Sequence, residues 1–240
     1  MALDVNLLLL IVELALLAAT LTLILLGRRE ERGRQILLKE IAKTAKLVSR
    51  QEYFNNVQSG MQSATKAIKG AITGSLPLTS DAEELVQNII VQIKRSRERG
   101  VLVQYLMIKS FDRISIASRY HAVGADIRFH PSLVVSDIRY VIIDQKRVIL
   151  GLPTSSGENE PTREGYMIPS EGLAEIFLQQ FEGKWGQAVD YDIYLKEIVS
   201  EMRSHSPRVS SELLASKLKV PESEIARVSP EPTGAICSEL

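Results

Sequence analysis

Residues 5–26 form one almost uninterrupted apolar segment, and no other feature of the sequence constrains the fold as strongly. Glu13 is the only ionisable residue within it. A helix of this length, at about 1.5 Å per residue, crosses roughly 30 Å of hydrocarbon. A cleaved signal peptide would instead have a basic start, a shorter apolar run and small residues at a cleavage site, whereas here only Asp4 carries a charge before the run. The sequence therefore predicts an uncleaved transmembrane helix over residues 1–27.

Lys and Arg residues are concentrated on the C-terminal side of this segment. Between residues 27 and 50 the chain has eight of them against three Glu, and none precedes the segment. Because loops rich in Lys and Arg stay on the cytoplasmic side of a membrane, this asymmetry predicts a single-pass protein of the cell membrane. We expect the N-terminus outside, the rest of the chain in the cytoplasm, and membrane lipid as a partner.

Apolar residues continue at helical spacing beyond the membrane segment, which predicts a basic juxtamembrane helix over residues 28–51. The apolar positions are Ile36, Leu37, Ile41, Ala45 and Val48. Three interpretations of this helix stay open. It could form a short coiled coil, lie on the lipid surface with its cations on headgroups, or be the first helix of the domain that follows.

The composition excludes several classes of protein. Lys plus Arg and Asp plus Glu are 29 each, so the net charge of zero excludes a general basic coat for nucleic acid. The single cysteine, Cys237, excludes a disulfide framework within one chain. The three histidines and Cys237 have no spacing typical of metal ligands. We therefore expect no metal and no cofactor.

Residues 52–189 alternate between helical and strand patterns, and this order predicts an α/β sandwich. The expected helices are 52–72, 80–99 (opened by the capping box Ser80–Glu83), 113–123, and one from Pro169 to Trp185. The expected strands are 101–108, 125–130, a hairpin of 138–143 with 147–150, and 166–168. Residues 151–165 are almost without apolar residues, which predicts a flexible loop.

The hairpin carries a motif with a specific spacing. Asp137-Ile138-Arg139 is followed after four residues by Asp144, and after six more by Gly151. This resembles the phospholipase D-like superfamily, whose motif is His-x-Lys, four residues, Asp, six residues, Gly. Arg139, Asp144 and Gly151 are in register with the Lys, Asp and Gly, and Asp137 stands in place of the His. The resemblance covers residues 52–189, one repeat of that fold.

The resemblance implies a ligand cleft and also a loss of catalysis. In the family the His is the nucleophile, and a second His-Lys-Asp set supplies the acid. Here Asp137 replaces the first His, and the sequence has no second motif. A homodimer would bring together two copies of the same degenerate set. We expect Asp137, Arg139 and Asp144 to lie close together at one end of the hairpin, beside Gly151, with Asp137 and Arg139 on one face.

The C-terminal region, residues 190–240, is predicted to be all helical. A helix is expected over residues 191–202, and residues 210–228 resemble the helix-turn-helix of winged-helix regulators. TrmB-type archaeal regulators join such a module to a degenerate phospholipase D-like sensor. Residues 201–240 have six acidic side chains against five basic ones, and the second helix opens with Glu222 and Glu224. These charges make nucleic acid an unfavourable partner and favour a small helical interaction hairpin.

The preferred hypothesis is a membrane-anchored cytoplasmic pseudoenzyme. Its catalytically silent phospholipase D-like domain would sense a phosphorylated or sugar-like ligand, or act as a scaffold for a protein partner or for itself as a homodimer. A second hypothesis is a homodimeric phosphodiesterase of the same superfamily, which Asp137 disfavours. A third is a membrane-tethered transcription regulator, which the acidic C-terminal region disfavours.

Overall fold

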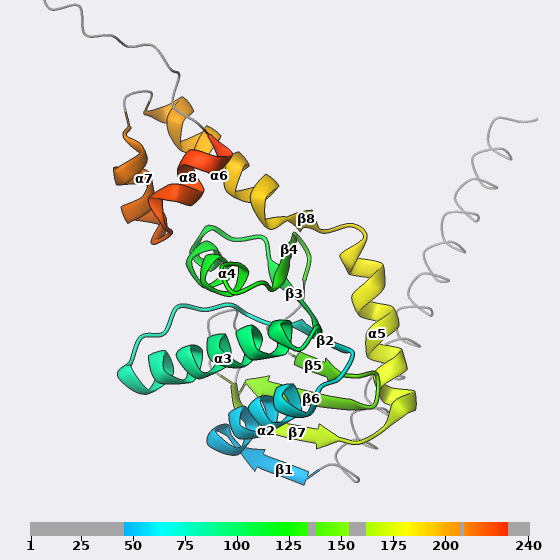
Figure 1. The fold of residues 1–240 in the computed structure, drawn as a ribbon. Helices are drawn as coiled ribbons and strands as arrows, with labels where there is room; N and C mark the ends of the chain where they lie inside the picture. Colours follow the sequence, from blue (N-terminus) through cyan, green and yellow to red (C-terminus); the bar gives the residue numbers. More distant parts are fainter. Residues whose placement is uncertain (1–45, 134–137, 154–161, 207–208, 230–240) are drawn as a thin grey trace, which may run out of the picture. The chain divides into compact units, whose positions relative to one another are not determined.

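The computed structural model describes residues 46–133, 138–153, 162–206 and 209–229 (Figure 1). The predicted transmembrane helix over residues 1–27, most of the predicted juxtamembrane helix, and Asp137 lie outside these ranges. Within the described ranges, no helix is both long enough and apolar enough to cross a bilayer.

The described chain folds around one mixed sheet of eight strands in the order β1-β7-β6-β5-β2-β3-β4-β8. The strands are β1 Lys46–Ser49, β2 Ala67–Ala71, β3 Leu102–Ile108, β4 Asp126–His130, β5 Arg139–Ile143, β6 Arg147–Pro153, β7 Thr162–Ile168 and β8 Val189–Asp190. β2, β3 and β4 are parallel, and all other pairs are antiparallel. The centre of the sheet is therefore the junction between β2 and β5.

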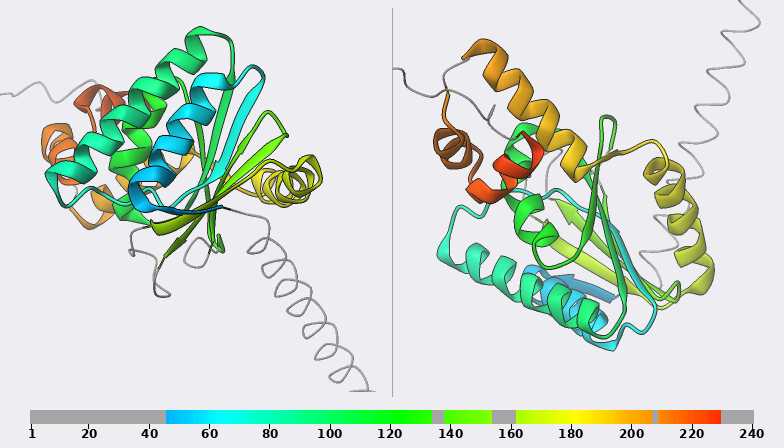
Figure 2. Two further views of the ribbon diagram at one scale, coloured as in Figure 1. Left: turned by 90° about the horizontal axis from the view of Figure 1, so that it is seen from below. Right: turned by 45° about the horizontal axis from the view of Figure 1, so that its top comes forward.

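Helices cover both faces of the sheet, as an α/β sandwich requires (Figure 2). The helices are α2 Arg50–Ser63, α3 Ser80–Glu98, the short 3₁₀ helix η1 Phe111–Arg113, α4 Ile114–His121, α5 Glu171–Trp185, α6 Tyr191–His205, α7 Ser211–Leu218 and α8 Glu222–Val228. α2, α3 and α4 lie on one face and α5 lies on the other. The predicted α/β sandwich is confirmed.

Strand alternation sorts the core into two layers. Val141 and Ile143 of β5 belong to the hydrophobic cluster under α2 and α3. Tyr140, which precedes Val141 and so points to the opposite face, faces α5 and has its ring 4.7 Å from that of Phe177. Arg139 precedes Tyr140, so it shares the α2 face with Val141, and this places the motif arginine under the helices rather than under α5.

The first predicted helix, residues 52–72, is wrong in its second half. α2 ends at Ser63, Ala64 is extended, and β2 follows at Ala67–Ala71. Helical and strand spacing cannot be distinguished in so short an apolar run, and tertiary pairing decides. β2 lies between β3 and β5, where Gly70 leaves room for the ring of Tyr105. A central strand was thus taken for the end of a helix.

Other boundaries also differ from the expectation. Lys46–Ser49, predicted as the end of the juxtamembrane helix, is strand β1, which pairs with β7. Ser49 then opens α2 with a capping box, since its side chain accepts from the Glu52 N–H while Glu52 accepts from the Ser49 N–H. α3 is capped by Thr79 rather than by the predicted Ser80. β6 and β7 extend into the predicted loop 151–165.

The C-terminal helices pack on the same hydrophobic cluster as the sheet. Leu214 of α7 and Ile225 of α8 are fully buried in it together with Leu195 of α6. Lys219 ends α7 in the left-handed conformation (φ 53°), which turns the chain sharply before α8. The predicted pair of helices within residues 210–228 is confirmed, and so is the helix over residues 191–202, which continues to His205.

Candidate functional site

The hairpin β5–β6 holds three of the four motif residues at defined positions. Arg139 begins β5 and pairs in register with Gly151 of β6, whereas Asp144 lies in the turn beyond the last residue of β5. Arg139 and Asp144 are therefore at opposite ends of the strand. The prediction that they meet at one end is wrong, because the four residues between them are a fully extended strand and not a loop. Asp137 lies outside the described residues.

Arg139 is buried, with only 4% of its surface exposed. Its Nη1 donates a hydrogen bond of 3.0 Å to the hydroxyl of Thr162 at the start of β7. Tyr53 of α2 lies close by. Burial raises the pKa of the Tyr53 phenol to about 12, although the positive charge of Arg139 acts in the opposite direction. A guanidinium group stays positively charged even when it is buried this deeply. Its electrostatic interactions are strong there because the surrounding dielectric constant is low.

Gly151 makes this arrangement possible. A Cβ at position 151 would lie 2.8 Å from Cγ2 of Thr162 and 3.1 Å from the hydroxyl of Tyr53. The glycine thus lets the helix α2 and the strand β7 approach β6 closely, directly beside Arg139. The motif glycine has a steric role here, which its place in the sequence pattern does not explain.

Arg139 lines a hollow with two compartments, between the sheet, α2, α3 and the segment that follows β2. The inner compartment has a volume of about 140 Å³ and the outer one about 320 Å³, and Arg139, Thr162 and Tyr120 line both. Thr73 and Ser75 also line both compartments. All the other described residues that line the hollow are uncharged.

A second buried arginine supports the rim of this hollow. Arg113, in η1, is 1% exposed. Its Nη1 donates a hydrogen bond of 2.6 Å to the hydroxyl of Ser75, and its Nη2 is 3.4 Å from a carboxylate oxygen of Asp112. The segment after β2 is therefore tied to η1 through a charge-assisted hydrogen bond.

Asp144 has a structural task at the far end of the hairpin. Its carboxylate accepts hydrogen bonds from the backbone N–H groups of Thr65 (2.8 Å), Lys66 (2.8 Å) and Ala67 (3.0 Å), and from the Thr65 hydroxyl (3.0 Å). Partial burial acts to raise the pKa of this carboxyl, but these four donors outweigh it and hold the pKa below the ordinary value of 3.8. Asp144 thus fixes the connection between α2 and β2.

Two residues of the site were not identified as site residues from the sequence. Thr162 fell in the predicted loop, and Tyr53 was one more apolar residue of a helix. No local pattern indicates that either would lie beside Arg139, since Thr162 is 23 residues and Tyr53 is 86 residues away from it in the chain. Only the pairing of β7 with β6 and the packing of α2 on both bring them together.

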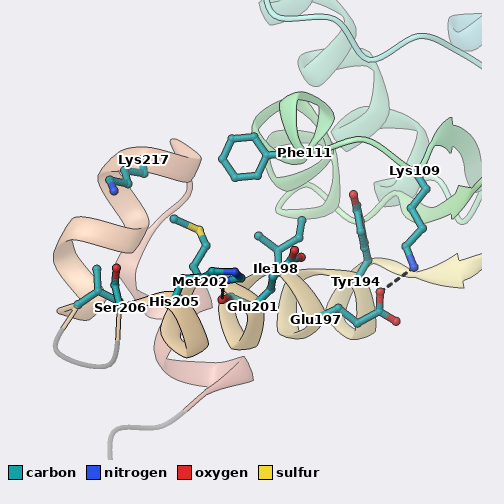
Figure 3. A pocket seen from close by; sticks show the side chains of 11 residues that line it. Lys109, Phe111, Tyr194, Glu197, Ile198, Glu201, Met202, His205, Ser206 and Lys217 are labelled. Atoms are coloured by element: carbon teal, nitrogen blue, oxygen red, sulfur yellow. Dashed lines mark hydrogen bonds and ion pairs between the residues drawn. The ribbon is translucent and has the colours of Figure 1, made fainter.

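A larger cavity, of about 680 Å³, lies along α6 and is separate from the motif (Figure 3). Its lining contains both signs of charge. Lys109 is 2.7 Å from a carboxylate oxygen of Glu197 and 5.1 Å from the ring centre of Tyr194. The lining has two lysines, Lys109 and Lys217, and two glutamates, Glu197 and Glu201, so these charges balance and do not select an anionic or a cationic ligand.

The first turn of α8 is docked against α4 and α6. Glu224, in the first turn of α8, accepts hydrogen bonds from the Tyr191 hydroxyl and from the Ser118 hydroxyl (3.1 Å). Arg227 of α8 is engaged by both carboxylate oxygens of Asp192, at 2.7 and 2.9 Å. The first turn of a recognition helix enters the major groove, whereas in this chain it faces α4 and α6.

Within the described residues, no three His, Cys, Asp or Glu side chains gather closely enough to hold a metal ion.

No family model matches the sequence, and no curated protein matches it. Among solved structures, the chain is similar to Nuc from Salmonella typhimurium, a phospholipase D family member, with 18% identity and a TM-score of 0.46 over 62% of this chain and 97% of that one. It is similar to NucT from Helicobacter pylori with 18% identity and a TM-score of 0.47, over 61% and 98% of the two chains. A third similar structure is that of TrmBL2, an archaeal chromatin protein with a novel mode of DNA binding (17% identity, TM-score 0.43, 74% and 68% covered).

Proposed function

We propose that this chain is a membrane-anchored protein whose phospholipase D-like domain binds an anionic ligand in the Arg139 hollow and does not hydrolyse it. The observation that carries the proposal is the buried guanidinium of Arg139, the one charge on the described lining of a hollow otherwise formed by hydroxyl, aromatic and aliphatic groups.

The chemistry of the lining favours a phosphorylated ligand with a partly apolar body. A guanidinium donates two parallel hydrogen bonds to a phosphate or carboxylate, and in a low-dielectric site such bonds are stronger than in water. Thr73 and Ser75 add hydroxyls that can donate to further oxygens, including those of a sugar. Phe54, Val86 and Ile89 line both compartments and suit the apolar part of the ligand.

The absence of hydrolysis is proposed from the groups that face the hollow. Hydrolysis of a phosphodiester needs a nucleophile and a group that protonates the leaving oxygen. The described lining has no His, Cys, Asp or Glu for either task. Asp144 is engaged by four donors at the other end of β5. Asp137, two residues before Arg139, replaces the nucleophilic His of the family motif.

The membrane anchor is proposed from residues 5–26, and the orientation from the eight Lys and Arg residues that follow them. The domain would then present its ligand site in the cytoplasm, at the membrane. Formation of a homodimer, or binding of a protein partner, would then depend on whether the hollow holds a ligand. No cofactor is required by this proposal.

Binding and turnover are tested on the same preparation, the full chain in detergent micelles. The probe is bis(4-nitrophenyl) phosphate, a monoanionic phosphodiester with aromatic arms, followed by calorimetry for binding and by absorbance for released nitrophenolate. We expect saturable binding without turnover above buffer. Arg139→Gln should weaken binding by about tenfold or more, because a charge-assisted hydrogen bond is lost.

A second pair of variants distinguishes loss of the binding site from loss of folding. Val86→Phe places an aromatic ring in the hollow, where it fills space that the ligand would occupy, and should abolish binding while Arg139 stays in place. Val91→Phe, on the same helix but with 42% of its surface exposed, should bind like wild type. Binding that is unaffected by Val86→Phe and by Arg139→Gln would refute the proposed site. Turnover that disappears in Asp137→Ala would instead establish the phosphodiesterase alternative.

A further inference from the structure

Lys66, Arg95, Arg99, Lys146 and Arg147 lie at the end of the sheet that is opposite the Arg139 hollow. We refer to them as the hairpin-end basic surface, because the β5–β6 turn lies at its centre. The side chains of two of these residues are bonded to the end of α2, and the backbone of a third is bonded to the turn. Arg99 donates to the carbonyl of Met61 (2.8 Å), Arg147 donates to the hydroxyl of Ser63 (2.8 Å), and the Lys66 N–H donates to Asp144 in the turn (2.8 Å).

Cations outnumber the accessible acids on this surface. Lys66, Arg95, Arg99 and Lys146 are exposed. Asp144, the acid at its centre, already accepts four hydrogen bonds, and Glu98 is the exposed acid beside Arg99. The net positive charge is therefore presented to solvent rather than neutralised within the fold.

The chain enters the domain from this same end. β1 and β6 are both antiparallel to β7, so they run in the same direction. β6 begins at Arg147, directly after the turn, and β1 therefore also starts from the end of the sheet where the turn lies. Residues 1–45, which contain the apolar segment 5–26 and six of the eight flanking cations, join the domain here.

From these observations we infer that the hairpin-end basic surface docks on the anionic phospholipid surface of the membrane in which the chain is anchored. This inference rests on the proposed membrane anchor and adds the orientation of the domain. The occupant is lipid rather than nucleic acid, because the apolar segment tethers this end of the domain near headgroups at high effective concentration. The Arg139 hollow then faces away from the bilayer, open to the cytoplasm.

The connection alone would not impose this orientation. Residues 27–45 would span about 60 Å when extended and about 30 Å as a helix, enough for the domain to turn freely. One Lys or Arg near an anionic surface changes an association constant by about fivefold, and the effect fades within a Debye length of about 8 Å at physiological salt. The orientation is therefore set by the cations, and it should depend on lipid charge and on salt.

Two probes on one helix test the orientation in the full chain, placed in nanodiscs after Cys237→Ser removes the native thiol. Gln62→Cys lies in the last turn of α2 at the basic surface, and Gln51→Cys lies in its first turn; both positions are exposed. They are about 16 Å apart along the helix. Each is labelled with a fluorophore, and lipids with a nitroxide on the headgroup act as the quencher.

We expect strong quenching at Gln62→Cys and weak quenching at Gln51→Cys in discs that contain phosphatidylserine. With phosphatidylcholine alone, quenching at both positions should be weak and alike. Lys66→Gln with Lys146→Gln should lower the docking constant by about 25-fold, whereas the matched pair Lys196→Gln with Lys217→Gln, on α6 and α7, should leave it unchanged.

The outcomes separate the anchor from the docking. Chain that fails to float with the discs would refute the anchor and the orientation together. Chain that floats but shows equal quenching at the two positions, or no effect of lipid charge, would refute the docking and leave the anchor standing. Loss of the Gln62→Cys quenching when a DNA duplex is added at equal concentration would identify nucleic acid as the partner and overturn the inference.

Discussion

Replacing Asp144 tests whether this motif residue serves the fold rather than catalysis. Its carboxylate accepts three backbone N–H groups and one hydroxyl between α2 and β2. A hydrogen bond to a charged group contributes about 1.5–3 kcal/mol to stability when water cannot reach the partner group after the bond is lost. It contributes less when water can take the place of the lost bond. Thr65 and Lys66 are exposed and regain water, whereas Ala67 is half-buried. We therefore expect Asp144→Ala to lower the free energy of unfolding by about 2–3 kcal/mol.

Asp144→Asn gives a smaller loss with a distinct dependence on pH. The amide keeps one acceptor oxygen but turns an NH₂ toward a backbone N–H, so we expect a loss of about 1–2 kcal/mol. The folded state lowers the pKa of the Asp144 carboxyl from its ordinary 3.8, so the stability that it contributes is complete above that value. It is lost as the pH falls through the lowered pKa, and the difference between wild type and Asp144→Asn should shrink over that range.

The assay is urea unfolding of the full chain in detergent, followed by fluorescence of Trp185, the single tryptophan, which is buried. With a typical slope of about 2 kcal/mol per molar urea, Asp144→Ala should lower the midpoint by about 1 M. Glu84→Gln, an exposed carboxylate on α3, is the control and should move the free energy of unfolding by less than about 0.5 kcal/mol. Equal midpoints for wild type and Asp144→Ala would refute the structural role.

Three further predictions concern the glycines, the turn and the topology. Gly165→Ala should destabilise by about 2–3 kcal/mol, because its Cβ would lie 2.5 Å from the Tyr53 ring, whereas Gly172→Ala, with open space in α5, should not destabilise; thermal unfolding measures both. Gln145→Gly should stabilise by about 0.5 kcal/mol in the same assay, since Gln145 has φ 59° and glycine relieves the left-handed strain; an unchanged midpoint would contradict this. Protease added to intact cells should leave residues 52–240 uncut, and their digestion without lysis would disprove the proposed topology.

The spacing of apolar residues was sufficient to predict a helix or strand where that element has a clear apolar pattern and clear ends. The strand β3 is a nearly continuous apolar run from Val101 to Ile108, interrupted only by Gln104, and was placed to within one residue. The helix α3 has one apolar stripe and ends in Arg97 and Arg99 before Gly100, as helices with a favourable dipole do. The α/β sandwich follows from the order of such elements, so this coarse level of the fold could be predicted.

Sequence patterns failed where strand pairing supplies the stabilisation. β2 has only five residues, Ala67–Ala71, among them two Ala and one Gly, with little strand propensity of their own. Its position between β3 and β5 supplies hydrogen bonds on both edges, and this outweighs the helical pattern that continues from α2. β1 and residues 164–167 of β7 pair with each other in the same way, and neither sequence pattern shows the partner.

The candidate site shows why a motif predicts residues better than it predicts geometry. The predicted hairpin with Asp144 in its turn is present, but the expected meeting of Arg139 and Asp144 at one end is wrong, and the structure shows Arg139 to be the register partner of Gly151. The spacing does not say which face of the strand is covered, or by what. α2 provides that answer, because its N-terminal half brings Tyr53 over Gly151 while its C-terminal end is held by Asp144. The motif therefore acts from both ends of one helix. Asp144 fixes where α2 ends, Gly151 fixes how closely it approaches, and Arg139 is left as the charged group beneath it.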